Sequence, residues 1–292
     1  MYRLAHITDI HIKYNTPEPN LGVFRALLTD AVSQGCGHIL LTGDLSDYCD
    51  NRDFAIIRDL LTEFKLLDTD RLSVVPGNHD IFGGPNPNLP FFLYPTHCKE
   101  MDYDANFNLF ALAMAETFAG TITDGDSIFP YIKILNDSVA VMGLNSIASY
   151  SKDLNPVGTN GLIDKQQMKS LSKISKQANL KDKLKIVLIH HHFNKPWHNK
   201  AHPEHGTWLE SEQWKMRLHD KQELFDYFNK YNIDLILHGH THITDTYKRK
   251  NNLFVNSSGC SMPFTISGEK EYHIIETEPR NRFNIVKRRI EA

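Results

Sequence analysis

The stretch 72-LSVVPGNHD-80 decides the fold, because it joins a short apolar run to a glycine and three polar residues. The run 72–75 has the length and the β-branched content of a buried strand. Asn78, His79 and Asp80 then fall just beyond the end of that strand. The chain repeats this arrangement, an apolar strand followed by Asp, His or Asn, at four other places.

Two of these other motifs precede the stretch and two follow it. Asp9-Ile10-His11 comes after the predicted strand 2–8, and Gly43-Asp44 comes after the predicted strand 38–42. His190 ends the predicted strand 185–189, and Gly239-His240-Thr241-His242 follows the predicted strand 234–237. Ligands of open α/β sheets gather at the carboxyl ends of the strands, so we expect all five motifs to meet at one edge.

The spacing within two of the motifs is also informative. Side chains two residues apart on an extended segment point to the same side. We therefore expect Asp9 and His11 to reach one ion together, and His240 and His242 to share a face.

The residue types in the five motifs indicate a metal site. Carboxylate, imidazole and amide ligands without thiolate suit Zn, Mn, Fe or Co. About seven candidate ligands exceed the number that one ion usually takes, and they fit two ions that share a carboxylate. Gly43, Gly77 and Gly239 permit the tight turns and the close backbone approach that such a crowded site requires.

Strand and helix patterns alternate along the first half of the chain, which favours an α/β sheet covered by helices. Residues 131–135 and 139–144 are predicted to form a hairpin, and 164-DKQQ-167 resembles a capping box. We expect one domain over 1–292, with an insertion at 81–125 that begins with an irregular loop and a strand-rich tail at 245–292. The remaining predicted helices are 23–33, 54–67, 106–118, 164–177 and 221–231, and the tail strands are 246–248, 253–256, 272–276 and 283–287.

Composition limits the classes of partner. The formal net charge of −3 predicts no strong field for nucleic acid or an anionic membrane surface. No apolar run approaches the ~20 residues of a membrane span, and the N-terminal residues lack the apolar stretch of a signal peptide. The four cysteines lack C-x-x-C spacing and are typical of free thiols in a reducing compartment, so we expect the cytoplasm. They are Cys36, Cys49, Cys98 and Cys260.

Taken in chain order, the five motifs resemble those of the calcineurin-like metallophosphoesterases, whose pattern is D-x-H, G-D, G-N-H-[DE], H and G-H-x-H. The resemblance implies a four-layer αββα sandwich of the α/β class, in which two mixed β-sheets are flanked by helices. It implies two divalent or trivalent metal ions, Mn, Fe or Zn, with Asp44 as the bridging ligand. The first ion would be held by Asp9, His11 and His242, and the second by Asn78, His190 and His240.

The resemblance also implies a mechanism. In such sites a metal-bound hydroxide attacks phosphorus in line, and the ions stabilise the attacking and leaving oxygens. His79 would act beside the leaving group as an acid or electrostatic stabiliser, Asp47 would orient it, and Asn78 would belong to the catalytic group as well as to the ligands. Purple acid phosphatases carry Tyr three residues after the bridging Asp. Here that position is Asp47, so the tyrosinate colour is not expected.

Within the family, residues 43–47, 161–171 and the triple His190-His191-His192 are similar to class III cyclic-nucleotide phosphodiesterases. This similarity suggests a small phosphate ester, first of all a 3′,5′-cyclic nucleotide, as substrate, with His191 and His192 in contact with it. The family also includes UDP-2,3-diacylglucosamine-type pyrophosphohydrolases, glycerophosphodiesterases and broad phosphomonoesterases. Aromatic residues within 85–96 would favour a lipid-bearing substrate if they lined a groove.

Two other classes stay open. One is a non-catalytic scaffold with the same fold, against which the complete ligand set argues. The other is a DNA-repair nuclease, against which the short and slightly acidic chain argues. The sequence is compatible with a homodimer, and it sets no role for His198, His202 and His205.

Overall fold

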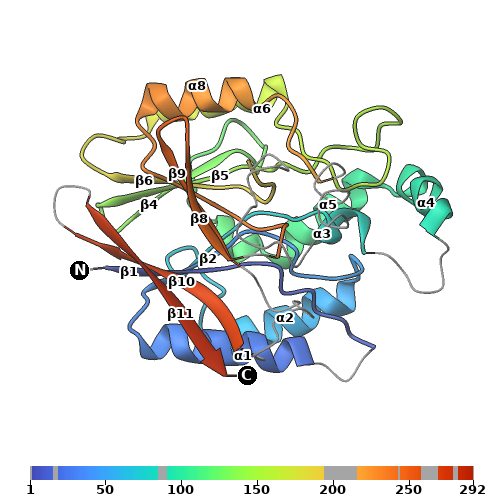
Figure 1. Ribbon diagram of the computed structural model, residues 1–292, viewed down its shortest axis with the longest axis horizontal. Coiled ribbons are helices and arrows are strands. Elements are labelled where there is room, and N and C mark those ends of the chain that lie inside the picture. Colours follow the sequence, from blue (N-terminus) through green and yellow to red (C-terminus); the bar gives the residue numbers. More distant parts are fainter. Residues whose placement is uncertain are drawn as a thin grey trace.

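The computed structural model describes residues 2–15, 19–84, 91–193, 216–242, 244–257, 269–278 and 282–291. Two mixed β-sheets lie face to face between layers of helices (Figure 1). The helices α1 (Pro19–Ser33) and α2 (Asn51–Glu63) cover one sheet, and α6 (Lys165–Gln177) and α8 (Lys221–Tyr231) cover the other. This four-layer arrangement confirms the predicted αββα sandwich.

The first sheet has the strand order β11-β10-β1-β2-β3. Its strands β1, β2 and β3 run parallel, because α1 and α2 return the chain to the same end of the sheet. The tail supplies β10 and β11, which pair antiparallel with β1 and with each other. The bounds are β1 Arg3–Ile7, β2 His38–Leu41, β3 Leu72–Val74, β10 Glu269–Thr277 and β11 Phe283–Glu291.

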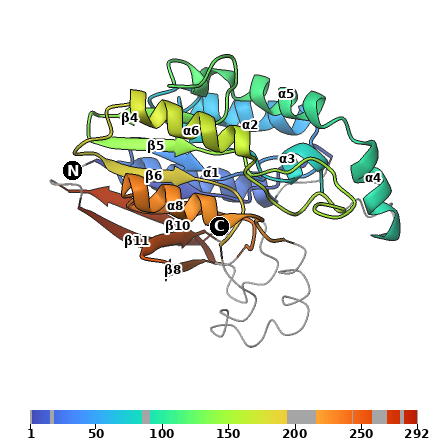
Figure 2. The same cartoon turned by 90° about the horizontal axis from the view of Figure 1, so that it is seen from above.

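The second sheet has the strand order β4-β5-β6-β7-β9-β8. The predicted hairpin is confirmed as β4 and β5, and β5, β6, β7 and β9 run parallel. Figure 2 shows α6 and α8 side by side over this sheet. The bounds are β4 Tyr131–Leu135, β5 Val139–Gly143, β6 Leu184–Leu188, β7 Leu235–His238, β8 Asp245–Arg249 and β9 Asn252–Asn256.

Register places the ends of the parallel strands together. Ile7 pairs with Leu41, which pairs with Val74, and in the other sheet Leu188 pairs with Leu237. These five side chains are buried in one hydrophobic core cluster. Burial of a side chain of this size contributes roughly 1.5–3 kcal/mol, so the core fixes the strand ends and thereby the positions of the polar motifs that follow them.

The insertion is more helical than predicted. It begins within α3 (His79–Phe82) and contains a 3₁₀ turn η1 (Phe91–Leu93), α4 (Tyr94–Glu100), α5 (Tyr103–Ala113) and η2 (Ala115–Phe118). The expectation of an irregular loop at its start is therefore wrong where α4 lies, and 85–90 fall outside the described residues. A proline is tolerated in the first turn of α4. Tyr94 and Cys98 pack with Phe82 in a small core of their own.

The start of α6 departs from the expected capping box in one respect. The side chain of Asp164 accepts a hydrogen bond from the backbone N–H of Gln167, at 2.7 Å. The side chain of Gln167 does not return to Asp164. It bonds both backbone groups of Asn145, at 2.8 and 2.9 Å, and so ties α6 to the segment after β5.

No helix within the described ranges is both long enough and apolar enough to span a lipid bilayer. Cys36, Cys49 and Cys98 are free thiols, and Cys260 lies outside the described residues.

Candidate metal centre

The five polar motifs follow β1, β2, β3, β6 and β7, at the carboxyl ends of those strands. Their side chains are buried or nearly so at the edge where the two sheets meet. Three sets of His and Asp side chains there have ligand atoms within 4.8 Å of one another. The first set is Asp9, His11, Asp44 and His242, the second is Asp44, His190 and His240, and the third is His11, Asp47 and His79.

In the first set, ring nitrogens face each other and face carboxylates. Nε2 of His11 lies 3.1 Å from Nε2 of His242 and 3.6 Å from Oδ2 of Asp44. Nε2 of His242 lies 3.6 Å from Oδ1 of Asp9. Because Nδ1 of His11 donates to Oδ1 of Asp47, at 3.0 Å, the neutral ring presents a lone pair to this set.

In the second set, Nδ1 of His190 donates to the backbone carbonyl of Thr42, at 2.8 Å. This bond leaves Nε2 to face Oδ1 of Asn78 at 3.1 Å, Nδ1 of His240 at 2.9 Å and Oδ2 of Asp44 at 3.4 Å. Nε2 carries at most one proton, which cannot form good hydrogen bonds to all three of these atoms. Burial lowers the pKa of His190, but Asp44, Asp9 and the carbonyl of Thr42 together outweigh burial and raise this pKa to about 9, so the cluster attracts positive charge.

These contacts fit two cations that share Asp44. Ligand atoms on opposite sides of one ion lie about 4–5 Å apart, since single bonds to protein ligands are about 2.0–2.6 Å. Burial raises the pKa of Asp9 to about 7, His190 opposes this rise and the nearby Asp44 carboxylate adds to it, so the charges of the protein alone do not offset the burial of this carboxylate. The donor set of carboxylate, imidazole and amide oxygen matches the predicted metals.

The backbone of these segments is unlike the predicted extended form. Asp9, His11, Asp44, His240 and His242 all have positive φ, between 49° and 75°. Such conformations are uncommon for residues other than glycine, and they cluster at functional sites. The prediction that His240 and His242 share a face is therefore wrong. The two rings belong to different ligand sets, since His240 faces His190 and His242 faces His11.

Two glycines allow the segments to approach. A Cβ on Gly77 would lie 2.1 Å from Oδ1 of Asp44, and a Cβ on Gly239 would lie 2.1 Å from Oγ1 of Thr8. A larger residue at either position would therefore force a buried neighbour to move.

Asp80 has a structural role that the motif alone did not indicate. Its side chain is fully buried, and Oδ1 accepts the backbone N–H groups of Leu45 and Ser46, each at 2.9 Å. Its Oδ2 accepts the N–H of Gly77 at 2.8 Å. One carboxylate thus joins the turn that carries Asp44 to the turn that carries Asn78. The sequence signal for it is its place as the acidic residue that ends the motif Gly77-Asn78-His79-Asp80.

His79 lies beside the shared carboxylate. Its backbone N–H donates to Oδ1 of Asp44 at 2.8 Å, and Nδ1 of its ring lies 3.2 Å from Oδ1 of Asp47. Burial lowers the pKa of His79, but the carboxylates of Asp44 and Asp47 outweigh it and raise this pKa to about 9. The imidazolium can therefore donate a proton from Nε2, while Asp47 holds the ring at Nδ1.

Comparison of the whole sequence with family models gives a match over residues 2–244 to the calcineurin-like phosphoesterases. The chain belongs to this family. Its members are metal-dependent phosphoester hydrolases, and the two sets that share Asp44 are candidate ligands for a dinuclear centre. No curated protein sequence matches the chain.

Solved structures share the fold of this calcineurin-like phosphoesterase. A dimetal phosphatase from Danio rerio matches with a TM-score of 0.63 at 11% identity, over 100% of this chain and 96% of that chain. Purple acid phosphatase from yellow lupin matches with a TM-score of 0.58 at 11% identity, over 98% of this chain and 51% of that chain. GAP50, the anchor in the inner membrane complex of Plasmodium, matches with a TM-score of 0.51 at 13% identity, over 99% of this chain and 84% of that chain.

The two histidines predicted to bind substrate, His191 and His192, are both buried. Nδ1 of His191 lies 2.7 Å from the hydroxyl of Ser146, and its Nε2 lies 3.2 Å from the carbonyl of Thr159. His192 is also buried, with its ring stacked near His240. Contact of either side chain with a phosphate stays a prediction. His198, His202 and His205 lie outside the described residues.

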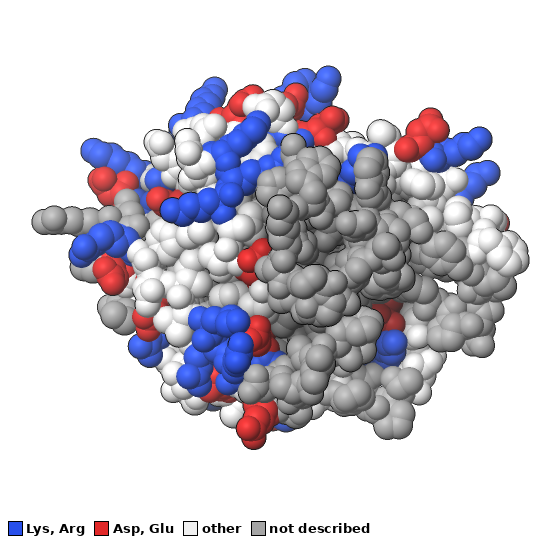
Figure 3. All heavy atoms as spheres, viewed as in Figure 1, with Lys and Arg blue, Asp and Glu red and all other residues white. Residues whose placement is uncertain are grey.

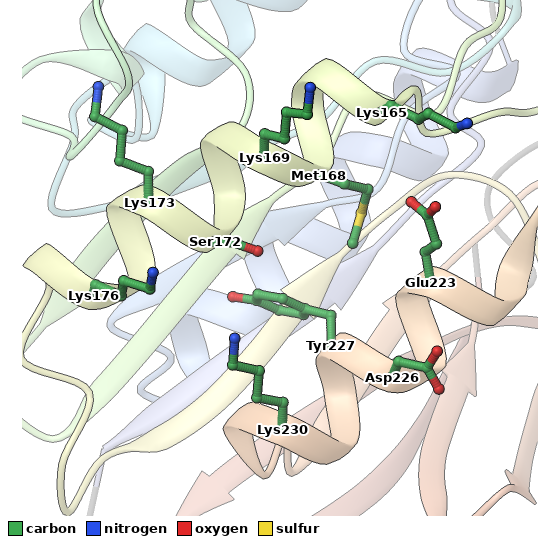
Figure 4. Close-up of a pocket in the computed structure, with 10 residues that line it drawn as sticks. All are labelled: Lys165, Met168, Lys169, Ser172, Lys173, Lys176, Glu223, Asp226, Tyr227 and Lys230. Atoms are coloured by element: carbon green, nitrogen blue, oxygen red, sulfur yellow. The ribbon is translucent and has the colours of Figure 1, made fainter.

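Two cavities lined by described residues lie away from this centre. One, of about 560 Å³, lies between α6 and α8 and is lined by lysines of α6 and by Tyr227 (Figure 4). The other, of about 800 Å³, lies between α5 and α6. The candidate ligands line neither cavity. On the face in Figure 3, the described Lys and Arg side chains lie in separate groups with Asp and Glu among them.

Proposed function

We propose that this phosphoesterase hydrolyses a phosphodiester at a centre of two metal ions, with a 3′,5′-cyclic nucleotide as the first substrate to test. The observation that carries the proposal is the shared position of Asp44, whose carboxylate belongs to both ligand sets while it accepts the backbone N–H of His79. One carboxylate thus connects both metal positions to the candidate acid.

The residues present fit this assignment. Asp9, His11 and His242 would hold the first ion, Asn78, His190 and His240 the second, and Asp44 both. When bound, metal ions of this kind lower the pKa of water and neutralise charge that develops on phosphoryl oxygens.

The protein's own contribution to the reaction is proton transfer and orientation. His79 would donate a proton from Nε2 to the leaving oxygen, since its ring is held at Nδ1 by Asp47 and its backbone by Asp44. Thr42 and Asp47 fix the tautomers of His190 and His11, so the nitrogens that face the centre are the unprotonated ones in the neutral rings.

Charge supports an anionic phosphate ester as substrate. Asp9 and Asp44 bring two negative charges, so two divalent ions would leave an excess of two positive charges, and the imidazolium of His79 would add a third. A diester with a deprotonated nucleophile uses two of these charges, and a dianionic monoester with the same nucleophile uses all three, so the substrate panel distinguishes the two. Among the described residues, the one Lys or Arg that forms an ion pair with this centre is Lys13, and Asp47 neutralises it.

A substrate panel with the purified protein and added Mn²⁺ tests the proposal. We expect bis-p-nitrophenyl phosphate to exceed p-nitrophenyl phosphate in kcat/KM, and 3′,5′-cyclic AMP to be hydrolysed faster than the 2′,3′ isomer. A preference for p-nitrophenyl phosphate would establish a phosphomonoesterase, and a preference for UDP-2,3-diacylglucosamine would establish a pyrophosphohydrolase. A protein that binds no metal and cleaves none of these compounds would be a scaffold.

A further inference from the structure

The Asp47 carboxylate holds three groups at once. Its Oδ1 lies 3.0 Å from Nδ1 of His11 and 3.2 Å from Nδ1 of His79, and its Oδ2 lies 2.9 Å from Nζ of Lys13. The rings of His11 and His79 meet edge to face, with centroids 4.4 Å apart. Nδ1 of His79 also lies 3.2 Å from the backbone carbonyl oxygen of Asp47. A candidate metal ligand and the candidate acid therefore share Oδ1 of Asp47 as a hydrogen-bond partner.

Lys13 reaches this carboxylate from the rim of the centre. Its side chain is 33% exposed, whereas that of Asp47 is 10% exposed. The backbone brings the two residues together, because the N–H of Asp47 donates to the carbonyl of Ile12 at 3.0 Å. Nζ of Lys13 also lies 5.2 Å from the centroid of the Tyr48 ring, a cation–π distance that restrains the ammonium.

The ammonium has a geometric consequence for the carboxylate. The terminal torsion of an Asp side chain is broad, so a carboxylate bonded through one oxygen can turn. In Asp47 the ammonium of Lys13 engages Oδ2, which leaves Oδ1 directed at His11 and His79. We propose that Lys13 is a positioning residue, which locks the Asp47 carboxylate so that one oxygen orients the metal ligand His11 and the acid His79 together.

The size of the effect separates this role from that of an ordinary surface ion pair. An exposed pair contributes about 0–1 kcal/mol to stability and nothing specific to a metal site. Groups that orient metal ligands through a hydrogen bond change metal affinity or activity roughly 10–100-fold. We therefore expect loss of Lys13 to change function far more than it changes folding.

The first experiment measures metal binding directly, so it does not depend on the proposed function. Metal-free wild-type protein, Lys13→Met and Lys13→Arg are titrated with Mn²⁺ in a calorimeter, with Lys169→Met, an exposed lysine on α6, as a matched control. We expect Lys13→Met to lose roughly tenfold or more in affinity at one of two sites. Arginine should restore most of the affinity, because it keeps the charge. The control should match wild type. Wild-type affinity in Lys13→Met would overturn the proposal.

The second experiment concerns His79 and rests on the proposed function. Initial rates at saturating Mn²⁺ are measured on aryl phosphodiesters with increasingly poor leaving groups. We expect kcat of Lys13→Met to fall more steeply along the series than that of wild type, while KM changes little. If kcat falls equally steeply along the series in both proteins, Lys13 does not act on His79, and that part of the proposal is wrong. If wild type binds two Mn²⁺ ions but hydrolyses no diester, the proposed function fails and the titration alone decides the role of Lys13.

A double-mutant cycle covers the case in which Lys13→Met folds poorly. Lys13→Gln and Asp47→Asn are combined, and thermal unfolding of each variant is recorded beside its Mn²⁺ affinity. If Lys13 acts through Asp47, the double variant should lose no more affinity than Asp47→Asn alone. Additive losses would show that Lys13 acts by another route and would refute the proposal.

Discussion

The backbone N–H of His240 donates to both oxygens of Asp9, at 3.0 and 3.2 Å, although the two residues are 231 positions apart in the sequence. Asp9 belongs to the first ligand set and His240 to the second. The position of His240 in one set therefore depends on a carboxylate of the other, and we expect the two metal positions to be coupled.

Asp9→Asn tests this coupling. The amide nitrogen would replace one of the two oxygens that accept the N–H of His240, so both sets should be disturbed although only one loses a ligand charge. Metal content, measured by mass spectrometry after dialysis against a chelator, should fall below one ion per protein. Asp126→Asn, at an exposed position, serves as the control. Retention of one full equivalent of metal would show that the two positions are independent.

Asp44→Ala should have the largest effect of any single change. Asp44 lies in both sets and accepts the N–H of His79, so its loss removes a ligand from each ion and releases the acid. We expect hydrolysis of bis-p-nitrophenyl phosphate to be abolished and metal content to fall at both positions. An active variant with two bound ions would refute the bridging role.

His79→Ala should keep both metal ions, because His79 lies outside the two ligand sets that share Asp44. We expect kcat to fall by ~10²–10⁴ on substrates with poor leaving groups, and much less on activated aryl esters, since general acid catalysis matters most for poor leaving groups. His219→Ala is a control outside the centre. Equal losses on both kinds of ester would contradict a role in leaving-group protonation.

The sequence was sufficient to predict the sheets and the meeting of the motifs. Runs such as 72–75 and 185–189 are apolar enough to be buried on both faces, and parallel register brings their carboxyl ends together. The sequence predicted a loop where α4 lies, because the Pro- and Asn-rich composition of that stretch is a local signal for turns. The helix is instead stabilised by tertiary packing of Tyr94 and Cys98 against Phe82, which local composition does not reveal.

The sequence did not predict the backbone conformation and the side-chain contacts of the centre, for a similar reason. Asp and His adopt positive φ more often than most residues do, but still rarely, so the residue types at Asp9 and His242 do not predict it and the surrounding structure decides it. The shared oxygen of Asp47 depends on the segments that follow three different strands, β1, β2 and β3, so no local pattern indicates that His11 and His79 meet.

Asp80→Asn should weaken the protein more than a surface change does. The amide oxygen can accept the N–H groups of Leu45 and Ser46, but the amide nitrogen then faces the N–H of Gly77. An unsatisfied buried donor costs roughly 1–3 kcal/mol, so we expect a clear fall in the urea midpoint together with weaker Mn²⁺ binding. Asp126→Asn again provides the reference. A variant with an unchanged midpoint and wild-type affinity would show that this tie between the two turns is dispensable.

Lys133 makes stability depend on pH. It is buried, and Nζ donates to the carbonyls of Leu72 at 2.6 Å and Thr117 at 2.8 Å. Burial lowers the pKa of Lys133 to about 7, although Asp70 and Asp68 oppose this. The unfolded chain, with a lysine pKa of about 10.4, binds more protons than the folded chain between these values. The free energy of unfolding should therefore rise with pH from about 7 to 10, by up to ~1.4 kcal/mol per pH unit.

Lys133→Met removes this titration. Urea unfolding of wild type and of the variant at several pH values between 7 and 10 gives the difference in their free energies of unfolding. We expect that difference to shift in favour of wild type as pH rises, because a neutral amine keeps both hydrogen bonds without the cost of a buried charge. If the difference in free energy of unfolding stays constant across this range, Lys133 is charged in the folded protein. The carbonyls of Leu72 and Thr117 would then stabilise the ammonium enough to offset its burial.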